Sequence, residues 1–177
     1  MKKHRGMRPH DIVVLLKVIT IKGDDWLIKD LANELYISQS EVSESLNRSL
    51  IAGLISNNRK RVLRSSLFDF LVYGLKYVYP VKPSSFVRGM RTAHSAPPLS
   101  DLILSEDVYV WPCIDGDTKG FSIEPLYPNL PKACKADNNL YELLVLIDAI
   151  RIGNKREIKF ALEELKIRLV QNEEYYN

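Results

Sequence analysis

The first fifty residues show apolar positions at helical spacing. The repeat begins with Ile12, Leu15, Leu16 and Ile19. It predicts a helix over residues 9–21, and a shorter amphipathic helix is expected from about residue 27 to residue 35. Ser38, with Glu41 three residues later, forms the capping-box pattern of a helix start. A third helix is therefore predicted over residues 38–52.

The next segment changes to a short strand pattern and then becomes apolar throughout. Residues 54–56 and 62–63 flank the polar tip 57–61, which predicts a small β-hairpin. Ser65 or Ser66 would cap the helix that follows. Residues 67–79 are apolar on nearly every side of this helix. Such a helix is either buried in the core or shared with a partner.

The region from 81 to about 135 holds most of the prolines and little helical periodicity. It predicts loops with limited β structure. The best strand candidates are residues 108–111 and 120–123, and Asp115-Gly116-Asp117 would turn between them to form a hairpin.

The last segment is helical again. Apolar stripes over residues 140–150 and 154–169 predict two helices, with Gly153 between them and Asn154 and Glu157 as a capping pair. A connection this short implies an antiparallel helical hairpin. The expected fold class is mainly α with small β-hairpins.

Composition narrows the classes of protein that fit. The chain has 46% hydrophobic and 27% charged residues, which suits a globular core and argues against disorder. The formal net charge is only +3, so nucleic-acid binding would need a local basic patch. Cys113 and Cys134 do not form a CxxC motif, so neither a disulfide framework nor a cysteine zinc site is expected.

The N-terminus imitates a signal peptide but lacks its defining parts. A basic start precedes an apolar run, yet Lys17 interrupts that run and no small-residue cleavage site follows. No stretch has the apolar length needed to cross a bilayer. We therefore expect a soluble cytoplasmic protein with no membrane contact.

The first third of the chain resembles a known family. The stretch from Leu31 to Ser43, followed by Leu46-Asn47-Arg48 and residues 52–55, is similar to bacterial winged helix-turn-helix regulators of the MarR-like type. The resemblance covers about residues 9–64. It implies a DNA-binding domain whose third helix enters the major groove. Tyr36 stands where this family often has a glycine.

This resemblance divides the chain into three expected parts. Residues 1–64 would be the winged helix-turn-helix domain, and residues 65–80 an apolar linking or dimerisation helix. Residues 81–177 would form a mixed region with the C-terminal helical hairpin, for interaction, dimerisation or effector binding.

The third predicted helix has a polar face suited to reading bases. With Val42 facing inward, a rotation of about 100° per residue places Ser40, Ser43, Glu44 and Asn47 outward, with Gln39 and Arg48 at the flanks. Amide side chains can pair with adenine, and arginine with guanine or a phosphate. Glu44 ranks lowest because a carboxylate repels phosphates. A merely solvated polar face is the alternative for this helix.

Backbone contacts are expected around this helix. Ser38 and Ser40 leave backbone amides near a phosphate at the helix start. Arg59, Lys60 and Arg61 form the tip of the predicted wing, which suits the DNA backbone or minor groove. The basic cluster of the N-terminus would act as an arm on DNA or remain a disordered tail. This cluster contains Lys2, Lys3, His4, Arg5 and Arg8.

No convincing catalytic or metal constellation is present in the sequence. His94 follows Arg88 and Arg91 and lies beside the hydroxyl residues Thr92 and Ser95. This cluster could hold an anion, but a loop histidine with surface arginines is the favoured interpretation. Asp115-Gly116-Asp117 lacks the downstream glutamate of a calcium loop. We expect no enzymatic activity, no metal and no cofactor.

The preferred hypothesis is a homodimeric, sequence-specific regulator that binds double-stranded DNA. Dimerisation is inferred from the apolar helix and the C-terminal hairpin, and a core role for both within one subunit is the alternative. A second hypothesis is an antitoxin-like or adaptor subunit, which uses the winged helix as a scaffold and binds a protein through residues 81–177. A weaker third hypothesis is a sensor pocket lined by Tyr109, Trp111 and Phe121.

Overall fold

The N-terminal helices form where the hydrophobic pattern places them. The computed structural model describes residues 6–21 and 23–171. It contains α1 (Pro9–Thr20), α2 (Ile28–Leu35) and α3 (Gln39–Ile51), which confirms the three expected helices. All residues of α1 from Asp11 to Ile19 are buried, so α1 is a core helix.

The segment after α3 folds back in a tight turn. Ile55 and Val62 form a single antiparallel bridge, which closes the turn over residues 56–61. The backbone amide of Leu63 also donates to the carbonyl of Leu54 at 2.9 Å. The expected hairpin is present, with only this one bridged pair.

The apolar stretch forms two helices where the sequence predicts one. They are α4 (Arg64–Tyr73) and α5 (Leu75–Val78), separated at Gly74, whose φ of −113° departs from helical geometry. Helix α4 starts at Arg64, and neither Ser65 nor Ser66 caps it.

A small three-stranded sheet follows and corrects two expectations. It contains β1 (Phe86–Arg91), β2 (Tyr109–Pro112) and β3 (Thr118–Ser122). The sequence pattern predicts a hairpin between β2 and β3, but these strands pair in parallel. Strand β1, which that pattern missed, pairs antiparallel with both, so the three strands close on one another.

Glycines allow this closure. A Cβ on Gly89 would lie 2.2 Å from the carbonyl oxygen of Trp111, and one on Gly120 would lie 2.4 Å from that of Val108. Both glycines are buried. The strands can therefore approach only because these two positions carry no side chain.

The C-terminal part is helical. It contains α6 (Leu130–Ala136), α7 (Asn138–Ile152) and α8 (Lys155–Lys166), followed by a π turn at Ile167–Gln171. Two short 3₁₀ turns, at Ala93–Ser95 and Leu99–Asp101, lie earlier in the chain, between β1 and β2. The expected helical hairpin of α7 and α8 is confirmed, including the capping box of Asn154 and Glu157. Helix α6 lies in the region where loops and limited β structure were expected.

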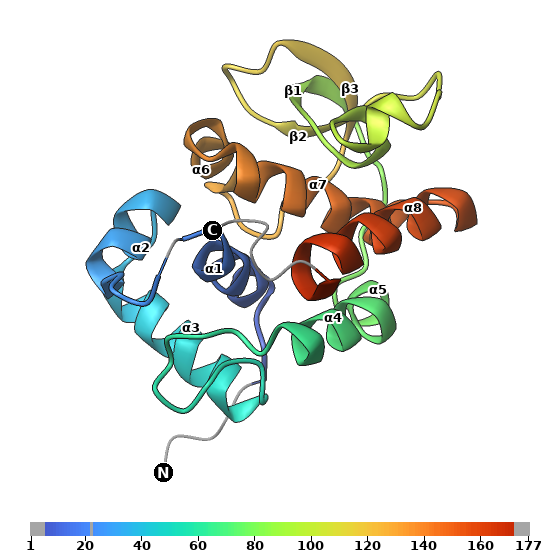
Figure 1. Cartoon of the computed structure of the whole chain (residues 1–177). Helices are drawn as coiled ribbons and strands as arrows, with labels where there is room; N and C mark the ends of the chain where they lie inside the picture. Colours follow the sequence, from blue (N-terminus) through green and yellow to red (C-terminus); the bar gives the residue numbers. More distant parts are fainter. Residues whose placement is uncertain (1–5, 22, 172–177) are drawn as a thin grey trace.

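One hydrophobic core joins the two halves of the chain. Buried residues from Ile12 to Leu169 form a single cluster, which crosses the boundaries expected near residues 64 and 80. Figure 1 shows α7 between the sheet and α1, with α2 and α3 beyond α1. The mainly α fold class with small β structure is confirmed, whereas the three-part division stays a prediction.

A buried polar network ties the sheet to α7. The carboxylate of Asp148 accepts hydrogen bonds from Trp111 Nε1 at 2.5 Å and Thr92 Oγ1 at 2.9 Å, and it pairs with Arg151 at 2.7 Å. Burial raises the pKa of Asp148 against the opposing effect of Arg151. These bonds fix the sheet on the central helix.

The expected dimerisation elements are largely internal. Helix α7 is buried along most of its length, which favours its core role within one subunit. Helices α4 and α5 bury Leu67, Leu71 and Leu75 but leave Tyr73 and Tyr77 75% and 80% exposed. Within residues 6–21 and 23–171, no helix is both long and apolar enough to span a membrane.

Candidate nucleic-acid interface

Helix α3 presents the polar face that its periodicity predicts. Val42, Leu46 and Ser49 are buried, whereas Gln39, Ser40 and Asn47 are exposed and Ser43 is half-buried. In the described part of the chain, no side-chain hydrogen bond engages any of these last four residues. Their amide and hydroxyl groups are therefore available to a ligand.

The orientation of the Arg48 side chain differs from the expected one. It was expected at the flank of the reading face, but its side chain is 8% exposed and turns toward α1. Its Nε and Nη2 atoms donate to the two carboxylate oxygens of Asp11 at 2.8 and 2.7 Å. A forked guanidinium saturates a carboxylate in this geometry, so the prediction that Arg48 faces a groove is wrong.

A cluster of charged groups surrounds Arg48. Its Nη2 also donates to Glu41 Oε1 at 2.7 Å, and that oxygen lies 2.8 Å from His10 Nε2. The hydrogen bonds with Asp11 raise the pKa of Arg48. Burial alone would raise the pKa of Glu41, but hydrogen bonds from Arg48 and His10 outweigh it and lower that pKa. The cluster fixes α3 against α1.

The start of α3 has one of the two hydrogen bonds of a capping box. Ser38 Oγ accepts a hydrogen bond from the backbone amide of Glu41 at 3.1 Å, as expected for an N-cap. The Glu41 carboxylate bonds to Arg48 and also to Arg8 at 3.3 Å, so it does not complete the expected capping box. Lys2, Lys3, His4 and Arg5 lie outside the described residues.

The turn between α2 and α3 is held by the second half of the chain. Tyr36 adopts left-handed backbone geometry, with φ of 54°. Its carbonyl accepts from Asn129 Nδ2 at 2.9 Å, and the Leu35 carbonyl accepts from the Tyr127 hydroxyl at 2.9 Å. Lys132 stacks over the Tyr36 ring at 4.0 Å. The sequence offered no signal for these long-range contacts.

The 56–61 turn carries three cations in different states. Arg59 is exposed and has a φ of 57°, and no ion pair engages it among the described residues. Lys60 Nζ donates to the Trp26 carbonyl at 2.6 Å and lies 4.3 Å from the centre of the indole ring. Arg61 pairs with Asp24 at 2.7 Å. Of the three predicted wing cations, only Arg59 is fully available.

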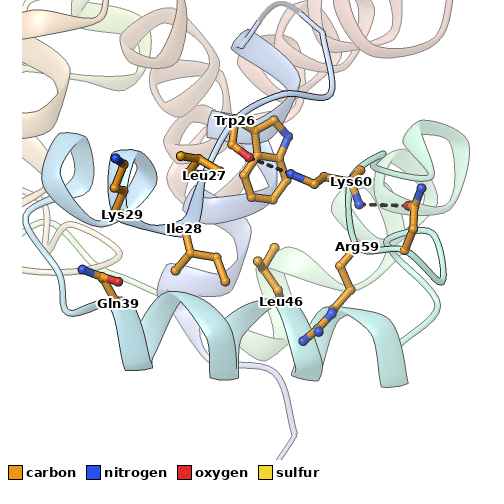
Figure 2. Close-up of a pocket in the computed structure, with 9 residues that line it drawn as sticks. Trp26, Leu27, Ile28, Lys29, Gln39, Leu46, Arg59 and Lys60 are labelled. Carbon is orange, nitrogen blue, oxygen red and sulfur yellow. Dashed lines mark hydrogen bonds between the residues drawn. The ribbon is translucent and has the colours of Figure 1, made fainter.

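A groove joins the turn to α3. Its volume is about 470 Å³. Figure 2 shows Lys29 and Gln39 at one end, Arg59 and Lys60 at the other, and Ile28 and Leu46 between them. The groove thus has an apolar floor and polar ends of positive charge. The sequence analysis did not include Lys29 among the candidate residues. Its position at the start of the second predicted helix could have indicated a cation near the start of the third.

The aromatic residues predicted to line a sensor pocket contact different rings. Trp111 is buried and packs edge-on against Tyr141 at 5.9 Å. Tyr109 contacts the His94 ring at 4.7 Å, whereas Phe121 contacts Phe86. Each ring thus contacts a different aromatic side chain, although Tyr109 and Phe121 are directly opposed on β2 and β3. The sensor pocket stays a prediction.

His94 lies in the short turn Ala93–Ser95, in keeping with the interpretation as a loop histidine, and its side chain is buried, with the residue 4% exposed. Its Nε2 bonds to the Asp107 carbonyl at 2.9 Å, and its Nδ1 lies 3.6 Å from Glu157 Oε1. Only Arg88 and Arg91 of that predicted cluster are exposed. In the parts of the chain that the structure describes, no group of three or more metal-ligating side chains is gathered.

Comparison with known proteins adds no relative: no family model matches the chain, and neither the curated proteins nor the solved structures contain a match.

Proposed function

We propose that this protein is a sequence-specific double-stranded DNA-binding regulator of the winged helix-turn-helix type. The observation that carries the proposal is the exposed, unbonded polar face of α3 beside a groove with basic ends. An α-helix with its side chains is about 10–12 Å wide, which fits the major groove of about 12 Å.

The base-reading residues are Gln39, Ser43 and Asn47. Asn or Gln can form two hydrogen bonds with adenine, and serine can donate or accept with several bases. Asn47 is exposed on the side of α3 away from the buried Val42, whereas the half-buried Ser43 and the exposed Gln39 lie toward the flank, where Gln39 lines the groove. Arg48 is excluded from this set because its guanidinium is bound to Asp11 and Glu41.

Phosphate contacts come from the two ends of the groove. Lys29 and Arg59 are exposed cations at opposite ends of the groove, and Lys60 adds charge from its position over Trp26. The backbone amides of Gln39 and Ser40, in the first turn of α3, are suited to a phosphate oxygen. Such contacts give affinity and register, whereas the α3 side chains give sequence selectivity.

The regulator acts as a homodimer in this proposal. Tyr73, Tyr77 and Val78 form an exposed apolar strip on α4 and α5, the helices that follow the 56–61 turn. Contact through this strip would place two copies of α3 on a palindromic site.

An adaptor or antitoxin-like role is the second candidate, and one observation favours it. With Arg48 internal, Glu44 is the one exposed charged side chain of α3, and a carboxylate there repels phosphate. A protein surface would accept this face more readily than DNA if the cations of the groove do not outweigh Glu44.

Selection of bound duplexes from a random DNA pool tests the proposal. The full chain should enrich a palindromic sequence, and its affinity for that sequence should fall steeply with salt. Enrichment of no sequence would refute the proposal and favour the adaptor role.

A further inference from the structure

The ribbon formed by β1 and β3 has an outer face with two aromatic rings and two cations. Phe86 pairs with Phe121, and Arg88 pairs with Lys119 across the antiparallel strands. Directly opposed residues share a face, as do residues two apart on one strand. These four side chains therefore form one surface, which we call the β1–β3 face.

The rings are exposed because the closed sheet has no space for them inside. The intervening pair, which faces the other side of the ribbon, is Val87, which is half-buried, and Gly120, which is buried. The carbonyl oxygen of Val108 lies 2.4 Å from where a Cβ on Gly120 would be. Phe86 is 61% exposed and Phe121 38% exposed. Their centroids lie 5.5 Å apart at 79°, so the rings meet edge to face.

The cations beside the rings are not neutralised by an ion pair with another described residue. Arg88 and Lys119 are exposed and form no ion pair with another described residue. Arg88 Nη1 donates to the carbonyl of Gly116 at 3.1 Å, which orients the guanidinium without neutralising it. Asp117, two positions before Lys119 in the chain, accepts a hydrogen bond from the Thr118 hydroxyl.

We propose that the β1–β3 face binds single-stranded nucleic acid. Unpaired bases stack on aromatic side chains, and a neighbouring positive surface follows the phosphates. Residues two apart on a strand are about 6.7 Å apart, so a ring and a cation lie within the span of one nucleotide. A duplex hides the faces of its bases, so this site is distinct from the duplex-reading face of α3. Figure 1 shows the sheet on the far side of the core from α3.

Fluorescence anisotropy of the full chain with labelled oligothymidine and oligouridine tests this site. Phe86→Ala and Phe121→Ala should each weaken binding by about tenfold, because each removes a stacking surface. Lys119→Glu should weaken binding further at low salt. Comparison of the two oligonucleotides shows whether DNA or RNA is preferred.

Matched controls separate this site from α3 and from misfolding. Leu104→Ala removes an exposed apolar side chain outside the sheet, and Lys155→Ala removes an exposed cation on α8; both should bind single strands as the wild type does. Asn47→Ala should also leave single-strand affinity unchanged. The Phe86, Phe121 and Lys119 variants should retain the wild-type circular dichroism spectrum and any binding to duplex DNA.

Two results would overturn the inference. One is the absence of saturable binding to either oligonucleotide by the wild type. The other is equal binding by the phenylalanine variants and the wild type, with full displacement by polyglutamate. That second pattern would mean that charge alone acts, and it would identify the face as a surface for an acidic protein.

Discussion

Asn47 and Arg48 are consecutive residues of α3 with opposite surroundings. Asn47 is exposed and its amide is free of side-chain hydrogen bonds among the described residues, whereas Arg48 is buried against Asp11 and Glu41. Periodicity orients the short side chains of this helix correctly. It misplaced Arg48 because a long side chain at the flank of a helix follows its partner, and Asp11 is 37 positions away in the chain.

This contrast predicts that the two substitutions differ strongly in their effect on the stability of the fold. Arg48→Ala should lower the free energy of unfolding by about 3–5 kcal/mol, because it leaves the buried Asp11 carboxylate without its partner. Asn47→Ala should change it by no more than about 0.5 kcal/mol. Urea unfolding of both variants measures this. A stable Arg48→Ala protein would show that the ion pairs do not hold α3 in place.

Glu41 should make part of the stability dependent on pH. Its pKa is lowered in the folded chain from an ordinary value of 4.5, so the unfolded chain binds the proton more tightly. The stabilisation is therefore present above about pH 4.5 and is lost as pH falls through the lower folded-state pKa. Glu41→Gln should flatten this part of the profile, measured by urea unfolding between neutral and acidic pH.

The control for this measurement is Glu44→Gln, because Glu44 is exposed on the same helix and forms no ion pair with another described residue. Its profile should follow that of the wild type. Suppose that Glu44→Gln reduces the loss of stability at acidic pH as much as Glu41→Gln does. The pH dependence would then come from acidic charge in general and not from the cluster around Arg48.

At the scale of elements, local patterns predicted helices better than strands. Helices α1 to α3 and the α7–α8 hairpin follow from apolar spacing and from capping pairs such as Asn154 and Glu157. Strand β1 was missed because it contains Gly89 and because its partners lie about 20 to 35 residues further along the chain. The parallel pairing of β2 with β3 occurs in a closed sheet in which β1 also pairs with both, and no local pattern reveals this arrangement.

The 56–61 turn supplies the next prediction. Arg59→Ala should weaken duplex binding and reduce the slope of log affinity against log salt by about 0.9, the contribution of one phosphate contact. Lys155→Ala, which removes an exposed cation on α8, should leave that slope unchanged. The measurement is a salt series with a selected duplex. Equal slopes for Arg59→Ala and the wild type would remove this turn from the DNA interface.

At the scale of the whole molecule, the two halves of the chain are interdependent. Tyr127 and Asn129 hold the turn that precedes α3, and Lys17 of α1 pairs with Asp137 at 2.6 Å, beside the start of α7. The sequence predicted the reading face but not this support, because both sides of each contact are distant in the chain. The second half is therefore part of what positions α3.

The proposed dimer makes a prediction at the same scale. Tyr77→Glu should convert a dimer to a monomer in sedimentation velocity, because it places a charge in the exposed apolar strip on α4 and α5. Leu104→Glu, at an exposed apolar position outside that strip, is the matched control and should remain dimeric. A wild-type protein that sediments as a monomer even when bound to a palindromic duplex would contradict the dimer.

The central claim is that the exposed side chains of α3 read DNA sequence. The most direct measurement compares the affinity of the wild type and of Asn47→Ala for a duplex selected by the wild type and for a scrambled duplex. The account predicts that Asn47→Ala loses most of the preference for the selected duplex, by about 1–3 kcal/mol, while its fold and its binding to scrambled DNA persist. An unchanged preference in Asn47→Ala would contradict the claim.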